Sequence, residues 1–191
     1  DLSKGKKIIC VSGTNGKTST TKALVSVISK LGSVATSPSG SNLERGIAAA
    51  LMNKSEYAVL EVDELHLSRV IEEAKPRAVL LLNLTRDQLH RMHEVKRVAD
   101  RWAKSASAAP ETIFFGDVDD PFVALALKSA AQAQRISFGG RKHLDAAVCP
   151  SCGKYLKWSR NNYKCSCGLS NSNPDESFES GSAAFRNATM A

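Results

Sequence analysis

The sequence predicts an α/β fold in which a mainly parallel sheet carries helices on both faces and a small cysteine-bearing module is inserted. Three observations carry this prediction. Short apolar runs alternate with longer stretches of helical periodicity, as in βαβ units. A glycine-bearing turn with a lysine at residue 17 joins the first apolar run to the first helical stretch. Four of the five cysteines fall between residues 149 and 167.

Strands are expected where short β-rich apolar runs meet polar or turn-forming residues. They cover residues 7–11, 57–62, 77–83, 112–115 and 135–138. Helices are expected in the stretches between them, where apolar residues recur at helical spacing. They cover residues 18–31, 43–53, 65–74, 87–106 and 121–133. Ligands of such sheets bind beyond the carboxyl ends of the strands, so the polar residues that follow each strand are the candidates for a site.

The chain divides into three expected parts. Its 191 residues, 42% of them hydrophobic, suffice for one core and one small satellite module. Residues 1–140 are expected to form the α/β domain and residues 141–170 the cysteine-bearing module. Residues 171–191 are expected to be a tail, either loop or a truncated continuation of the domain. The longest apolar run, near residues 78–82, is far shorter than the roughly 20 residues that span a bilayer.

Charge and cysteine content narrow the partners and the compartment. A formal charge of +7 and a pI near 9.3 favour anionic partners. The basic residues are scattered along the sequence, however, and a solvated surface accounts for them. An odd number of cysteines, most of them clustered, indicates a reducing compartment and a metal. Cys10 lies in the first strand and is expected to be a small buried side chain.

The turn after the first strand is expected to bind phosphate. Its glycines let backbone N–H groups point inward, Lys17 adds a positive charge, and the helix that begins near Thr18 directs its positive end to the same place. Thr18 can also offer its hydroxyl to a Mg²⁺ ion held by bound phosphates. The expected phosphate-binding residues are Gly13, Thr14, Asn15, Gly16, Lys17, Thr18 and Ser19. The alternative is a tight strand-to-helix turn without a ligand.

A carboxylate, Glu61, follows the apolar run at residues 57–60. It emerges at the same sheet edge as the turn, where a phosphate-bound Mg²⁺ needs a ligand from the protein. Thr18 and Glu61 are therefore the expected magnesium ligands. The alternative is an acidic cluster at a helix N-terminus, with Asp63 as the cap of the helix that begins near Leu65.

Four separated motifs resemble those of the Mur ligase family, whose members form amide bonds through ATP-derived acyl phosphates. The turn at residues 13–18 resembles the family loop G-T-N-G-K-[TS], with Val11 where the commoner phosphate loop has its first glycine. Residues 83–91 resemble the family's N-[LI]-x-x-D-H-L-D-R stretch. Residues 40–47 resemble G-x-N-x-x-x-G-[IL], and residues 117–121 resemble N-x-D-D-P.

The resemblance implies further nucleotide-binding residues. They are Asn83, Arg86, Asp87 and Asp117. Residue 117 is an asparagine in the family, where it helps to read adenine. Asp87, Asp119 and Asp120 have an alternative role as helix caps. His90 stands where the family has aspartate, and we expect it and His93 to be surface histidines.

The clustered cysteines form two close pairs that bracket twelve residues, a ribbon-like arrangement of two turns. Four thiolates suit tetrahedral zinc, and such a site is structural because every position around the metal is filled. The expected zinc ligands are Cys149, Cys152, Cys165 and Cys167. The second pair has a single spacer residue, which leaves His143 open as a substitute ligand. Two disulfides, or four free thiols, would also be compatible with this spacing.

Gln88, within residues 86–89, and the expected zinc ribbon resemble the MurT-type branch of the family, the subunits of lipid II isoglutaminyl synthase. The resemblance implies ATP, Mg²⁺ and Zn²⁺ as cofactors. It also implies that the γ-phosphate passes to the α-carboxyl of the D-glutamate in lipid II. Ammonia from a GatD-type glutamine amidotransferase subunit then displaces the phosphate and gives D-isoglutamine. Such a protein is cytoplasmic and bacterial, and meets lipid II at the inner face of the membrane.

The chain is expected to be a central domain alone, because family members begin earlier and continue into a C-terminal domain with the acyl-transfer residues. It should bind nucleotide without completing amidation. One alternative is a Mur-like ligase that adds an amino acid, although these keep histidine at the position of Gln88 and lack the ribbon. Another is a ribbon that binds nucleic acid through basic residues beside Trp158 and Tyr163. Those basic residues are Lys154, Lys157, Arg160 and Lys164. We expect no nucleic-acid partner.

Overall fold

A seven-stranded parallel sheet forms the centre of the computed structural model, which describes residues 5–37, 44–85, 92–139, 143, 145–160 and 162–178. The strand order is β2-β3-β1-β4-β5-β6-β9. The strands are β1 (Lys7–Ser12), β2 (Val34–Thr36), β3 (Tyr57–Glu61), β4 (Ala78–Leu81), β5 (Ile113–Asp117), β6 (Gln132–Ser137) and β9 (Glu176–Ser177). Because neighbouring strands are parallel, all of their carboxyl ends meet at one edge of the sheet.

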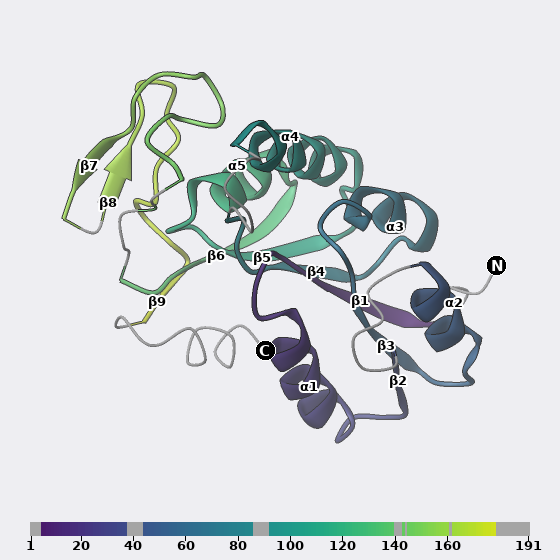
Figure 1. The fold of residues 1–191 in the computed structure, drawn as a ribbon. Coiled ribbons are helices and arrows are strands. Elements are labelled where there is room, and N and C mark those ends of the chain that lie inside the picture. Colours follow the sequence, from purple (N-terminus) through teal and green to yellow (C-terminus); the bar gives the residue numbers. More distant parts are fainter. Residues whose placement is uncertain are drawn as a thin grey trace.

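Helices cover both faces of the sheet, which confirms the expected fold class. Figure 1 shows α1 on one face and α3, α4 and α5 side by side on the other. The helices are α1 (Lys17–Ile28), α2 (Glu44–Met52), α3 (Leu67–Ala74), α4 (Met92–Ala108) and α5 (Pro121–Ser129). No helix in the described part of the chain is long and apolar enough to cross a membrane.

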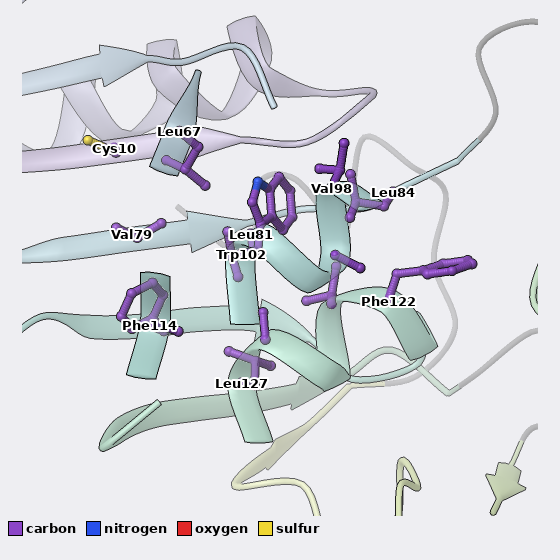
Figure 2. Close-up of a cluster of buried hydrophobic side chains, with 14 of the residues drawn as sticks. Cys10, Leu67, Val79, Leu81, Leu84, Val98, Trp102, Phe114, Phe122 and Leu127 are labelled. Carbon is purple, nitrogen blue, oxygen red and sulfur yellow. The ribbon is translucent and has the colours of Figure 1, made fainter. Parts of the chain in front are cut away.

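Alternate residues of the central strands supply two separate cores. Cys10, Val79 and Leu81 face a large cluster that includes residues of α2 to α5. Figure 2 shows the indole of Trp102, from α4, among the surrounding leucine and valine side chains of this cluster. Val11 faces the opposite way, into a smaller cluster that includes residues of α1. This alternation is the two-residue period of a strand buried on both faces.

The cysteine-bearing module lies between β6 and β9 in the chain. Its strands β7 (Lys157–Ser159) and β8 (Asn162–Lys164) form an antiparallel hairpin at the β6 end of the sheet (Figure 1). After the hairpin the chain returns to the sheet, where β9 pairs with β6. The module is therefore flanked on both sides by strands of the main sheet.

Several boundaries differ from those expected. The short strands β2 and β9 were not expected, because three and two residues are too few to show a period. The helix expected at residues 121–133 ends at Ser129, since Ala130 has extended backbone angles and β6 begins at Gln132. The start of the helix expected at residues 87–106 lies outside the described residues. That helix is α4, and it extends to Ala108.

Candidate nucleotide site and cysteine centre

The phosphate loop follows β1, which lies between β3 and β4 in the sheet. Residues from the ends of all three strands therefore converge on it. Gly13 has φ 146° and Gly16 has φ 89°, both in the range that favours glycine. A Cβ at Gly13 would lie 3.0 Å from backbone atoms of Asn83, so the loop packs directly on the chain that follows β4. Both glycines are required by the shape of the turn.

Hydrogen bonds join the loop to residues 83–85. Thr14 donates its N–H to the carbonyl of Asn83 at 2.9 Å. The Asn83 side chain accepts from the N–H of Asn15 at 3.1 Å and donates to its carbonyl at 2.9 Å. The Thr14 hydroxyl accepts from the N–H of Thr85 at 3.0 Å. In this state Asn83, an expected nucleotide contact, holds the loop in position.

The N-terminus of α1 remains available for an anion. Its first backbone bond joins the N–H of Thr20 to the carbonyl of Gly16 at 3.0 Å. The N–H groups of residues 17–19 precede that bond and lie at the positive end of the helix. Ser19 is exposed at this terminus. The terminus thus has the donors that a phosphate group requires.

Thr18 and Glu61 come together although they lie 43 positions apart in the sequence. The Thr18 hydroxyl lies 2.9 and 3.1 Å from the two carboxylate oxygens of Glu61. Glu61 is buried, with 8% of its surface exposed. A hydroxyl and a carboxylate are the oxygen ligands that Mg²⁺ prefers, so this pair fits the expected ion.

Lys17 is held against its own loop. Its Nζ donates to the carbonyls of Gly13 at 2.6 Å and Thr14 at 3.3 Å, and lies 3.3 Å from a carboxylate oxygen of Glu64. The carbonyl of Glu64 in turn accepts from the indole N–H of Trp102 at 3.0 Å. The charged end of Lys17 must leave these partners to reach a phosphate that lies beyond the helix terminus.

The acidic residues near the site have separable roles. Asp63 accepts from the N–H of Leu65 at 2.9 Å and so caps the turn before α3, as the alternative interpretation of the acidic cluster expected. Asp120 accepts from the N–H groups of Phe122 and Val123 and is the N-cap of α5. It also accepts from the N–H of Leu84 at 2.7 Å, which ties α5 to the end of β4.

Asp117 and Asp119 are buried at the end of β5. Asp117 accepts from the N–H of Asp119 at 2.9 Å. The Asp119 carboxylate accepts from the N–H of Phe138 at 2.8 Å, from the Ser137 hydroxyl at 3.0 Å and from the Asn171 amide at 2.9 Å. Asp119 does not cap α5; it ties the loop after β5 to β6 and to the segment that follows the cysteine module.

Some expected residues cannot be placed. Arg86, Asp87, Gln88 and His90 lie outside the described residues, as do residues 40–42 and the side chain of His93. Glu64 and Thr85 were not among the expected site residues, although both follow strands that were expected at this edge. Their polarity at a strand end was the available signal.

The four clustered cysteines converge as expected. Their Sγ atoms all lie within 4.8 Å of one another, with 3.6 Å between Cys149 and Cys167 and 3.4 Å between Cys152 and Cys165. Zn–S bonds of about 2.3 Å would place tetrahedral sulfurs about 3.8 Å apart, so the set fits zinc. All five cysteines are free in this structure, so it contains neither of the two alternative disulfides.

Backbone donors surround the sulfurs. The N–H of Leu169 lowers the pKa of Cys167 to about 6, and the N–H of Cys167 lowers the pKa of Cys165, whereas burial raises the pKa of Cys149 to about 12. At Cys165 and Cys167 such donors stabilise the thiolate form that binds metal. Cys10 stands apart in β1, where burial raises the pKa of its thiol to about 12.

His143 is not part of the cysteine cluster, so its interpretation as a substitute ligand is wrong. Its Nε2 lies 3.4 Å from a carboxylate oxygen of Asp120, and its ring packs edge-on against Phe122 at 5.6 Å. Burial lowers the pKa of His143, but Asp120 and the nearby Asp145 and Asp117 outweigh burial and raise it overall. The attraction to the N-cap of α5 explains its position.

The cysteine module docks on the loop after β5. Tyr163 is 1% exposed and donates its hydroxyl to the carbonyl of Val118 at 2.9 Å. Lys128, in the last turn of α5, donates to the carbonyl of Cys167 at 3.2 Å. Because Tyr163 is buried here, it is not available to stack on a nucleic-acid base.

The parallel sheet with helices on both faces and the glycine-bearing turn between β1 and α1 define an α/β domain of the phosphate-loop type. Residues 11–170 match the Mur ligase middle domain family, and the chain belongs to it.

Sequence comparison relates the chain to one branch of that family. It is 30% identical to the MurT subunit of lipid II isoglutaminyl synthase (glutamine-hydrolyzing) from Streptococcus pneumoniae, over 85% of this chain and 39% of that protein. The same subunit from Staphylococcus aureus is 30% identical over 85% of this chain and 41% of its own length. The chain thus spans about two fifths of these relatives.

Solved structures share the fold. A pseudomurein peptide ligase type C from Methanothermus fervidus superposes with a TM-score of 0.68 and 18% identity, over 97% of this chain and 46% of that chain. MurF ligase from Thermotoga maritima in complex with ADP gives a TM-score of 0.65 and 19% identity, over 97% and 44%.

Proposed function

We propose that this chain is the ATP-binding central domain of a ligase that amidates the D-glutamate of lipid II to D-isoglutamine in peptidoglycan synthesis. One observation carries the proposal. The Thr18 hydroxyl and the Glu61 carboxylate form a pair of oxygen ligands suited to Mg²⁺ beside the Lys17 loop, in a chain that is 30% identical to MurT subunits. Peptidoglycan ligation is the coarser activity that family membership supports, and the amidation and its partner are the finer part of the proposal.

The chain's own residues would act by position and charge. Thr18 and Glu61 would hold Mg²⁺, which neutralises phosphate charge when bound. The N–H groups at the start of α1 and the ammonium of Lys17 would hold the phosphates of ATP. Asn83 keeps the loop in place, and Asp117 stands where adenine recognition is expected. Arg86 and Asp87 complete the proposed nucleotide contacts.

The cysteine centre would have a structural role. The sulfurs of Cys149, Cys152, Cys165 and Cys167 would fill all four positions around a zinc ion and would leave none for a substrate. Zinc bound there would fix the hairpin of β7 and β8 against the loop after β5. The module would thereby support the end of β5 where Asp117 lies.

The partner would be a glutamine amidotransferase subunit of the GatD type, in a bacterial cytoplasm. The name of the MurT relatives includes glutamine hydrolysis, which supplies ammonia. The substrate would be lipid II at the inner face of the membrane. Because the relatives extend well beyond the matched region, the acyl-transfer residues are proposed to lie in sequence outside this chain.

Isothermal titration of the chain with ATP and Mg²⁺ tests nucleotide binding. Lys17→Ala should weaken binding about tenfold or more, since it removes a charge-assisted contact worth roughly 1.5–3 kcal/mol. Lys22→Ala is the matched control, because Lys22 is an exposed lysine on the same helix. Equal affinity of Lys17→Ala and wild type would contradict the proposal. Glutamine-dependent amidation of lipid II by the longer protein with its partner tests the finer part.

A further inference from the structure

A recess lies at the opposite edge of the sheet from the phosphate loop. It has a volume of about 1170 Å³ and lies among the starts of β1, β4 and β5, the length of α3 and the C-terminal half of α4. The six residues of β1 separate it from the loop by about 20 Å. Nothing in the proposed ligase chemistry uses this edge.

The recess is rich in basic residues. Seven of the 26 lysine and arginine side chains of the chain line it together with two glutamates, which gives the lining a net charge of +5. Three of the cations already have partners. Lys7 pairs with Glu56, Arg69 pairs with Glu73, and Lys6 donates to the carbonyls of residues 53 and 55.

The other four cations, Lys75, Arg77, Arg101 and Lys104, are exposed and make no ion pair or side-chain hydrogen bond with the described part of the chain. They come from segments that lie apart in the sequence, which is why the basic residues look scattered there. Clustered like charges repel one another and are stabilised by an anionic partner.

The rest of the lining indicates what kind of anion fits. Leu65 contributes apolar surface that is 53% exposed, and Pro76 is buried in the same recess. Glu72 and Glu111 place acceptor oxygens among the cations. Apolar surface and acceptors suit a polypeptide, which has side chains to bury and N–H groups to donate, whereas a polyphosphate has neither.

We propose that this recess is a docking site for an acidic segment of another polypeptide, whose carboxylates face the four free cations and whose apolar side chains cover Leu65. A bilayer surface would meet cations that protrude rather than line a recess. Among the described residues, no aromatic side chain lines the recess to stack a base, as single-stranded nucleic acid requires.

Fluorescence anisotropy with a labelled peptide, in which glutamates alternate with leucines at helical spacing, tests the proposal. The peptide should bind the wild-type chain, more weakly at higher salt. It should bind about tenfold more weakly to a variant with K75Q, R77Q, R101Q and K104Q, because four individually weak, exposed contacts are lost together. A peptide with glutamine in place of glutamate should not bind.

The matched control carries K22Q, K30Q, K154Q and K157Q, which remove the same charge from exposed lysines outside the recess. It should bind the peptide like wild type. Equal loss in both variants would overturn the proposal, because net charge alone would then explain binding. The proposal would also be overturned if the wild-type chain bound polyphosphate, an oligonucleotide or anionic phosphatidylglycerol vesicles more tightly than the peptide, and if the variant without the recess cations lost this binding. Circular dichroism checks that both variants fold.

Discussion

The parallel sheet and the cysteine module are held together by different means. The sheet buries two continuous apolar clusters around β1, β3 and β4, and Trp102 lies fully inside the larger one. The module has a two-stranded hairpin and four converging thiols. The sheet thus has extensive hydrophobic cores of its own, whereas the module buries apolar side chains such as Leu156 and Leu169 only at the edge of the larger cluster. We expect so small a unit to depend on a metal and on docking as well.

The two regions meet through apolar and polar contacts, because Leu156, Tyr163 and Leu169 of the module belong to the same hydrophobic cluster as residues of α5. Hydrogen bonds also join the regions. The Tyr163 hydroxyl of the module donates to the loop after β5, and so does the Asn171 amide of the segment that follows the module. The Lys128 ammonium of α5 donates to the module. These contacts make the comparison testable. If the two regions unfold as one cooperative unit, a destabilising substitution in either region should destabilise both. If they unfold independently, the loss of stability should be confined to the substituted region.

The largest effect should come from loss of a cysteine ligand. Cys149→Ser removes one of the four sulfur ligands and should abolish the binding of one zinc ion per chain. The effect should be large, because structural zinc supplies on the order of 10 kcal/mol to small domains of this kind. The hairpin should then lose protection from hydrogen exchange while the central strands keep theirs. Zinc content by mass spectrometry and amide exchange measure the two outcomes.

Cys10→Ala is the control for that experiment, since Cys10 is a free cysteine in β1 outside the cluster. It should keep the full zinc content. If Cys149→Ser kept its zinc as well, the four-thiolate assignment would be wrong. If the central strands lost their protection together with the hairpin, the contrast between a self-sufficient sheet and a dependent module would not hold.

The next largest effect should come from Asp119→Ala. The substitution leaves the N–H of Phe138 and the amide of Asn171 without their acceptor in a buried position. Its expected cost is about 3 kcal/mol in the free energy of unfolding. Urea denaturation measures it, and Asp100→Ala is the control because Asp100 pairs with Lys96 on the exposed face of α4. A cost below that of the control would show that the two regions are not coupled through Asp119.

The sheet was predictable because its signals are local. A strand such as β1 shows its apolar run within six residues, and a parallel sheet then determines that Thr18 and Glu61 meet at one edge. The four cysteines were predictable for the same reason, since two close pairs imply two turns. Sequence alone therefore specified most of the fold and the central part of the candidate site.

Contacts set by tertiary packing were not predictable. Asp119 looked like a helix cap from its place before Pro121, but Asp120 holds that role and Asp119 binds residues on β6 and beyond the module. His143 looked like a possible ligand because it precedes the cysteines, yet its charge partner is Asp120. The partners of Asp119 are distant in the sequence, and His143 pairs with one of several adjacent carboxylates. No local sequence pattern identifies these partners.

A smaller effect should follow Tyr163→Phe. The ring stays buried, but the carbonyl of Val118 loses its donor at 2.9 Å. The expected loss is about 1 kcal/mol in the free energy of unfolding. Tyr155→Phe, at a side chain that is 81% exposed, should change little. If thermal denaturation gave the two variants the same stability, the Tyr163 hydroxyl would not contribute to docking.

The smallest effect should be a pH-dependent one at His143, which lies on the segment that leads from the sheet to the cysteines. Asp120 raises the pKa of His143 despite burial, so the protonated imidazole is favoured in the folded chain. This contribution to stability is fully present below the ordinary pKa of about 6.5 and is lost as pH rises through the raised value. His143→Gln should therefore lower the free energy of unfolding by up to about 1 kcal/mol at pH near 6, and by less as the pH rises toward 8. Urea denaturation of both proteins across this range measures the difference. A difference that stayed constant with pH would mean that His143 contributes through its packing on Phe122 and not through its charge.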